Sequence, residues 1–185
     1  QQAFAPDELV ELSFVDAEIF DGLPLVPARF EAARLDAALG RGVFSTPESV
    51  VFSAQGDRAS GEDFSLNQEV GRFRFGRNGE IAFDGEAGAG ITLAATGRGE
   101  LLLERREEKE IRVFVDGGAK LETEAGAGVV AFAEKIEFLG EESEAGEFRP
   151  SVATASGGVV FDGWGGRFEG QGARFLFDEK GGLKE

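Results

Sequence analysis

Apolar residues recur at every second position along much of this chain, and this alternation constrains its fold more than any other feature. Successive side chains of a β-strand point to opposite faces, so each run places one row of apolar side chains on one face. In several runs the intervening residues are polar, which is typical of half-buried antiparallel strands. The clearest runs are 73–75, 81–83, 91–93, 111–115, 136–138 and 175–177.

Dipeptides that favour tight turns punctuate these runs. Asp-Gly occurs at 21–22, 84–85, 116–117 and 162–163, and Asn-Gly occurs at 78–79. Both dipeptides favour the positive φ angles of two-residue hairpin turns. We predict a hairpin at Asn78-Gly79, which lies between two alternating runs. Many short strands with glycine-rich turns indicate an all-β domain, built as a sandwich, jelly roll, barrel or solenoid.

Two segments depart from the alternation. Glu31–Leu39 (EAARLDAAL) has high helix propensity and precedes Gly40, so taken alone it predicts a short helix. A faint internal repeat argues for a strand instead, because the segment from Arg29 resembles the strand-like segment from Arg167. Glu104–Glu110 (ERREEKE) is seven charged residues in a row, which predicts a solvated hairpin tip or an exposed helical turn.

The chain has 18 Phe but no His, Cys, Met or Tyr. The absence of His and Cys excludes Ser-His and Cys-His catalysis, thiol nucleophiles and the usual zinc sites. We find no calcium-loop or phosphate-loop pattern, and we predict no catalytic residue, no metal site and no cofactor. Carboxylates are plentiful, so a hydrolase that uses only paired acids stays open as a weaker alternative.

The net charge is −16, from 35 acidic and 19 basic residues. This balance argues against nucleic acid as a partner and disfavours anionic membrane surfaces. No apolar run approaches the roughly 20 residues that span a bilayer, so we expect no transmembrane segment. We predict a single all-β domain over residues 1–185, with 1–8 as a disordered start. The start at Gln1 and the small residues after it favour an exported, periplasmic chain whose signal peptide has been removed.

Two stretches resemble the periplasmic lipopolysaccharide-transport proteins of the OstA-like superfamily, which includes LptA and LptC. Residues 61–66, leading into 71–75, are similar to the middle of an LptC-type domain. Residues 166–178 (GRFEGQGARFLFD) resemble the recurring unit of the family most closely. The likeness runs loosely from about Leu12 to the C-terminus. The chain departs from the family in lacking an N-terminal membrane helix and in its acidity, which suits phosphorylated lipid A poorly.

The resemblance implies an elongated antiparallel β-jelly roll of two sheets, open along one side. Such folds carry lipid acyl chains between their sheets and join other β-jelly-roll envelope proteins end to end through edge strands. The residues expected to line the lipid site are Phe64, Phe73, Phe75, Phe83, Phe132, Phe138, Phe161, Phe175 and Phe177, with Phe168 beside them. The partner edges are expected at 9–14 and 173–177, and they include Leu12, Phe14, Phe175 and Phe177.

Two alternatives accompany this reading. Any single one of these Phe residues is better explained by an ordinary closed core, in which case the chain is a structural β-solenoid or sandwich, a component of the cell envelope or of a surface assembly, with no ligand. Trp164, in the glycine-rich stretch 162–166, is either a packed turn residue or an exposed aromatic contact.

Overall fold

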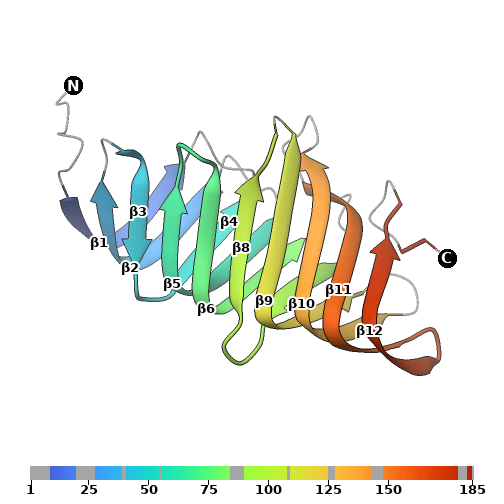
Figure 1. The fold of residues 1–185 in the computed structure, drawn as a ribbon. Helices are drawn as coiled ribbons and strands as arrows, with labels where there is room; N and C mark the ends of the chain where they lie inside the picture. The colour runs from blue at the N-terminus through green and yellow to red at the C-terminus, as the bar shows by residue number, and fades with distance from the viewer. Residues whose placement is uncertain are drawn as a thin grey trace.

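A computed structural model describes residues 9–19, 28–38, 41–54, 56–83, 90–107, 109–124, 128–142, 148–178 and 183–184. The described residues form twelve strands and no regular helix, as the alternation predicts (Figure 1). The predicted disordered start at 1–8 lies outside the described residues. The strands are β1 (Leu9–Ile19), β2 (Ala28–Ala38), β3 (Val43–Thr46), β4 (Val50–Ala54), β5 (Asp57–Asn67), β6 (Arg72–Phe83), β7 (Ile91–Ala95), β8 (Glu100–Arg105), β9 (Glu110–Thr123), β10 (Val129–Glu142), β11 (Phe148–Gly163) and β12 (Gly166–Leu176).

All the strands belong to one antiparallel meander. The pairing follows the order of the chain, from β1 at one end to β12 at the other, except that β3 does not pair with β4 and β7 does not pair with β8. Two positions in this order are occupied by two short strands each. β3 and β4 both lie between β2 and β5, and β7 and β8 both lie between β6 and β9. We call each position in the order a rung.

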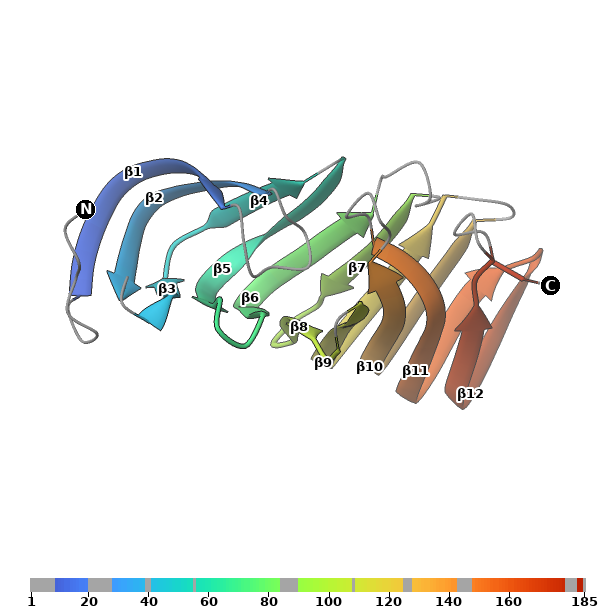
Figure 2. The ribbon, with the colours of Figure 1, turned by 90° about the horizontal axis from the view of Figure 1, so that it is seen from above.

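The rungs bend in the middle, so the sheet folds into two facing layers (Figures 1 and 2). The first layer contains β3 and β8, and the second contains β4 and β7. Each of the long strands β5, β6, β9, β10, β11 and β12 contributes one half to each layer. The layers are therefore joined along one long side by the bends, which we call corners. This supports the predicted all-β, antiparallel architecture.

Glycine and asparagine with positive φ make several corners. Asn78 has φ 52° inside β6, Gly117 and Gly118 have φ 86° and 128° inside β9, and Gly157 and Gly158 have φ 82° and 69° inside β11. Residues of this kind adopt such angles at least cost, and inside a strand they redirect the chain. The corners thus lie where the local sequence tolerates a sharp change of direction.

The predicted hairpin at Asn78-Gly79 is wrong, because β6 runs unbroken from Arg72 to Phe83. The dipeptide instead carries the rung from one layer to the other. Asp116-Gly117 likewise lies within β9. Asp162-Gly163 does precede a hairpin, whose tip is Trp164-Gly165 with φ 48° and 76°. The dipeptides at 21–22 and 84–85 lie outside the described residues.

The helix suggested by Glu31–Leu39 is also wrong, since Ala28–Ala38 forms β2. This strand pairs with β1 on one side and with β3 and β4 on the other, and these ladder hydrogen bonds override its helix propensity. Leu39 itself lies outside the described residues. The charged run Glu104–Glu110 spans the predicted hairpin connection, because β8 ends at Arg105 and β9 starts at Glu110; residue 108 lies outside the described residues.

The core fills the space between the two layers. Phe75, Leu101, Val113 and Ile136 are all 0% exposed. Gly61 shows how closely the corners pack against this core, because a Cβ added there would lie 2.6 Å from Cγ of Phe75.

Candidate functional site

Phenylalanine rings from both layers meet in the half of the interior nearer β1. Phe30 and Phe52 come from the second layer, and Phe64, Phe73 and Phe75 come from the first. The ring centroids of Phe30 and Phe64 lie 5.6 Å apart, and Phe52 stacks on Phe73 at 5.5 Å. These are ordinary separations for packed aromatic pairs. The rings of the facing layers therefore contact one another directly.

A second aromatic cluster lies towards the β12 end. Phe83 ends β6 in the second layer, and Phe148 begins β11 in the first layer. Their ring centroids lie 4.6 Å apart, and the ring of Phe138 lies 5.6 Å from that of Phe177. Both Phe83 and Phe148 lie at the strand ends opposite the corners. Their contact therefore joins the two layers along the side where no corner connects them.

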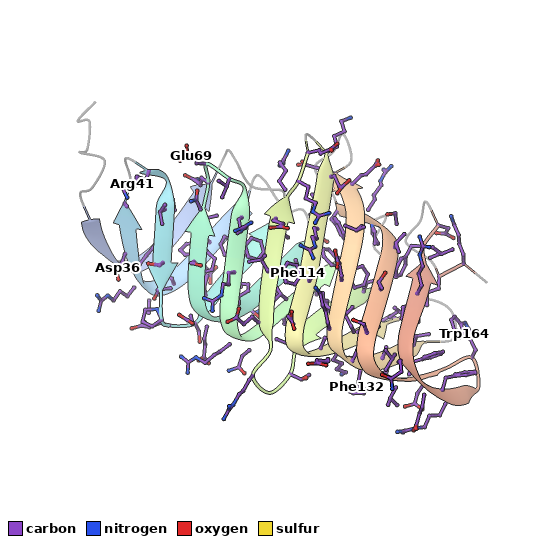
Figure 3. The ribbon with its side chains drawn as sticks, viewed as in Figure 1. Asp36, Arg41, Glu69, Phe114, Phe132 and Trp164 are labelled. Atoms are coloured by element: carbon purple, nitrogen blue, oxygen red, sulfur yellow. The ribbon has the colours of Figure 1, made fainter. Side chains whose placement is uncertain are left out.

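Most of the predicted lipid-lining residues lie in this interior. Their exposed fractions range from 0% to 4%, and they are Phe64, Phe73, Phe75, Phe83, Phe138, Phe175 and Phe177. Phe161 is half-buried. The prediction is wrong for Phe132, which is 44% exposed and lies on the outer face of β10 (Figure 3). The small neighbours Val129 and Ala131 take the inner positions of that strand.

The last rung leaves aromatic side chains exposed. Phe161 of β11 stacks on Phe168 at 4.7 Å and meets Trp164 edge-on at 5.9 Å. Phe168 is 47% exposed and Trp164 is 49% exposed. Trp164 therefore contacts Phe161 and also presents an exposed surface at the β11–β12 hairpin tip (Figure 3). These rings lie beside β12, which is the last strand of the sheet among the residues that the structure describes.

The two predicted partner edges are the terminal strands of the meander. In β1, Leu12 pairs with Leu35 of β2; Phe14 lies in the same strand, whose side chains are not among those described. Phe175 of β12 and Phe177, which follows the end of that strand, point into the interior, so the edge offers their backbone rather than their rings. Residues 183–184 return to this edge only at its end, where Leu183 bridges to Phe177.

The outer face of the first layer carries a row of ion pairs across four strands. Glu104 of β8 accepts hydrogen bonds from Arg72 at 2.9 Å and from Arg112 at 3.1 Å, and Arg112 also donates to Glu137 of β10 at 2.6 Å. The Arg112 guanidinium lies 4.3 Å from the centroid of the Phe114 ring. This row connects β6, β8 and β9 through directly opposed residues, and it reaches β10 diagonally, since Arg112 is paired with Leu139 and Glu137 with Phe114.

The ion pairs determine the protonation of Glu104. Burial acts to raise the pKa of this carboxyl, but hydrogen bonds from Arg112 and Arg72 outweigh burial and hold its pKa below the ordinary value. A hydrogen bond from Arg74 likewise lowers the pKa of Glu100. A carboxyl that stays ionised in this way is a poor general acid. Glu104 and Glu100 are therefore ionised partners of arginine side chains on the outer face of the first layer.

A cleft of about 390 Å³ lies at the rim of the first layer, between the end of β10, the start of β11 and the residues that follow β12. Its lining includes charged side chains of both signs, which are Glu141, Glu142, Arg149, Asp178 and Lys184. The other lining residues are Pro150, Ser151 and Phe177. Sequence reasoning missed this cleft because its residues come from four separate stretches of the chain, 141–142, 149–151, 177–178 and 184. No group of three potential metal-ligating side chains occurs in the described part of the chain.

No family model, curated protein or solved structure was found to match this chain. Among the residues that the structure describes, none belongs to a helix of the length and apolarity needed to cross a membrane.

Proposed function

We propose that this chain is a non-enzymatic, extracytoplasmic protein that binds lipid acyl chains between its two layers. In this proposal it is a periplasmic jelly roll of the OstA-like kind. It passes lipopolysaccharide-type lipids along a bridge of partner β-folds, and the edges of β1 and β12 form the junctions. One observation carries the proposal: two Phe-lined layers are joined through the chain along one long side, and side-chain contacts such as Phe83–Phe148 join them along the other.

Lipid entry would require the two layers to part on the side away from the corners. Separation of Phe83 from Phe148 would expose the inner Phe rows, and an acyl chain would then replace contacts between rings with contacts between rings and methylenes. Burying each methylene is worth about 0.8 kcal/mol, so a chain of about ten methylenes gains roughly 8 kcal/mol before the costs of opening and ordering. This gain supports binding even though the closed interior is well packed.

The surface charge indicates which part of the lipid makes contact. A net charge of −16 repels phosphorylated headgroups at long range. The proposal therefore places the acyl chains in the interior and leaves the headgroup outside, in solvent.

A second candidate function is a structural component of the cell envelope with no ligand. The observation that favours it is the direct contact of rings across the interior, such as the stacking of Phe52 on Phe73 at 5.5 Å. Such contacts fill the space between the layers without a lipid. The two functions differ in whether the layers separate.

The test measures uptake of a fluorescent fatty acid together with native mass spectrometry and lipid extraction of the purified chain. The lipid proposal expects uptake by the wild type and faster uptake by Phe148→Ala, which removes the contact opposite the corners. Phe132→Ala is the matched control, because it deletes the same ring from the outer face. If no acyl lipid co-purifies and neither the wild type nor Phe148→Ala takes up fatty acid, the structural function holds instead.

A further inference from the structure

We infer that the β12 edge pairs with the β12 edge of a second copy of this chain, forming a two-fold symmetric dimer. The inference names the occupant of one junction in the proposed function, but it does not depend on lipid binding. Of the five large hydrophobic residues that are exposed in the described part of the chain, three lie at this end: Trp164 (49%), Phe168 (47%) and Leu176 (43%). Exposed aromatics beside an open sheet edge mark a surface that another chain covers.

The edge is available over most of its length. β11 pairs with one side of β12, and in the described part of the chain no strand pairs with the other side between 166 and 175. Beyond that point the return of the chain takes the edge, because Lys184 N donates to the carbonyl oxygen of Leu176 at 2.8 Å. A partner strand therefore has room beside the stretch up to Phe175.

The shape of β12 suits a two-fold axis. Its first half lies in the second layer and its second half lies in the first, with the corner near Gly170–Gly172 (Figures 1 and 2). Rotation about an axis through this corner, bisecting the two layers, exchanges the halves and reverses the strand direction. Two copies related in this way continue the meander antiparallel, with one two-layered interior running through both.

The inner and outer faces select one register. Phe168 and Phe175 face inward, since they pair with Phe161 and Ala153, whereas Glu169 and Arg174 face outward. A register that opposes Phe168 to Phe175 of the second copy matches inner side chains with inner ones. A shift of the register by one residue places Phe168 opposite Arg174 of the second copy. An inward-facing side chain would then lie opposite an outward-facing one, which a sheet with one buried face does not tolerate.

This register also matches charge. Glu169 falls opposite Arg174 of the second copy, and the symmetry repeats this pair once more. Glu169 already contacts Arg167 of its own strand, with an N–O distance of 3.2 Å, so the new pair extends an existing cluster. The uncovered Phe168 rings are buried at the same time. When two copies of β12 pair antiparallel in this register, inward-facing residues therefore lie opposite inward-facing residues, and acidic residues lie opposite basic ones.

The net charge of −16 on each copy opposes association, so the test is run at physiological salt, where the screening length is about 8 Å. Sedimentation equilibrium of the lipid-free chain is expected to show a reversible dimer. Arg174→Glu places two carboxylates opposite each other in both of the symmetry-related pairs. It is expected to raise the dissociation constant of the dimer by roughly tenfold or more. The double variant Glu169→Arg with Arg174→Glu restores opposite charges and is expected to restore dimerisation.

Arg98→Glu is the matched control, because it makes the same charge change on an exposed turn far from β12 and should leave the dimer unchanged. Since the chain has no cysteine, mixed Glu169→Cys and Arg174→Cys chains should form a disulfide with each other and thereby report the register. A wild type that stays monomeric, an Arg174→Glu dimer as tight as the Arg98→Glu dimer, or a double variant without rescue overturns the inference. Fatty-acid uptake, measured separately, tests the lipid proposal alone.

Discussion

Replacement of Phe52 by alanine tests whether the interior is a packed core. Phe52 is 2% exposed, and its ring lies within 6.4 Å, centroid to centroid, of the rings of Phe30, Phe64, Phe73 and Phe75. Three of these neighbours, Phe64, Phe73 and Phe75, come from the facing layer, so the rings that surround the gap are held by both layers and no single side chain can move in to fill it. Deletion of a buried Phe ring costs about 3–5 kcal/mol when the cavity cannot collapse.

The measurement is urea unfolding followed by circular dichroism, with a thermal scan beside it. For a chain of this size about 4 kcal/mol lowers the melting temperature by roughly 8–16 °C. The control is Phe132→Ala, which loses the same ring at a site that is 44% exposed, so its expected cost is about 1 kcal/mol. If Phe52→Ala costs no more than Phe132→Ala, the rings do not form a close-packed core and the reasoning from their contacts fails.

Three further predictions concern the ion pairs and the corners. The pKa of Glu104 is lowered in the folded chain, so its ionised carboxylate stabilises the fold above the unfolded pKa of about 4.3. This stabilisation is lost as the pH falls through the folded pKa. The urea unfolding midpoints of the wild type and Glu104→Gln should therefore differ at neutral pH and converge in acid. Gly61→Ala should destabilise by about 1–3 kcal/mol, since its Cβ would lie 2.6 Å from Phe75, whereas Gly170→Ala, with its nearest contact at 3.8 Å, should be nearly neutral by the same unfolding assay. Asn78→Ala should cost about 1 kcal/mol because φ is 52° there, and Asn78→Gly should cost less; equal unfolding midpoints for the two variants would contradict the role assigned to that angle.

The sequence predicts the strands better than their connections. Asn adopts a positive φ in a hairpin turn and, as Asn78 does, in a strand corner, so the dipeptide Asn78-Gly79 carries the same local signal in both cases. The outcome depends on whether the chain continues into a facing layer, which is a property of the whole sheet. Helix propensity around Ala33 fails for a related reason, because the pairing of β2 on both edges outweighs it.

The misplacement of Phe132 has a local physical cause. Ile136 and Phe138 are buried at even positions, and extending their alternation backwards places Phe132 on the same inner face. The pairing of β10 is irregular between Phe132 and Lys135, and this shift reverses the parity of the strand. Val129 and Ala131 therefore face inward instead. A bulge of this kind leaves little trace in composition, so alternation alone does not reveal it.

The meander has a consequence for how the chain folds and how its length can change. Because every rung pairs only with the rungs next to it in sequence, most backbone pairing forms between segments close along the chain, which favours rapid, stepwise growth from any hairpin. Stability then resembles a sum over neighbouring rungs, as in repeat proteins. Removing or inserting a pair of rungs would preserve the direction of every strand that follows, so lengthening by hairpin duplication is open to this architecture.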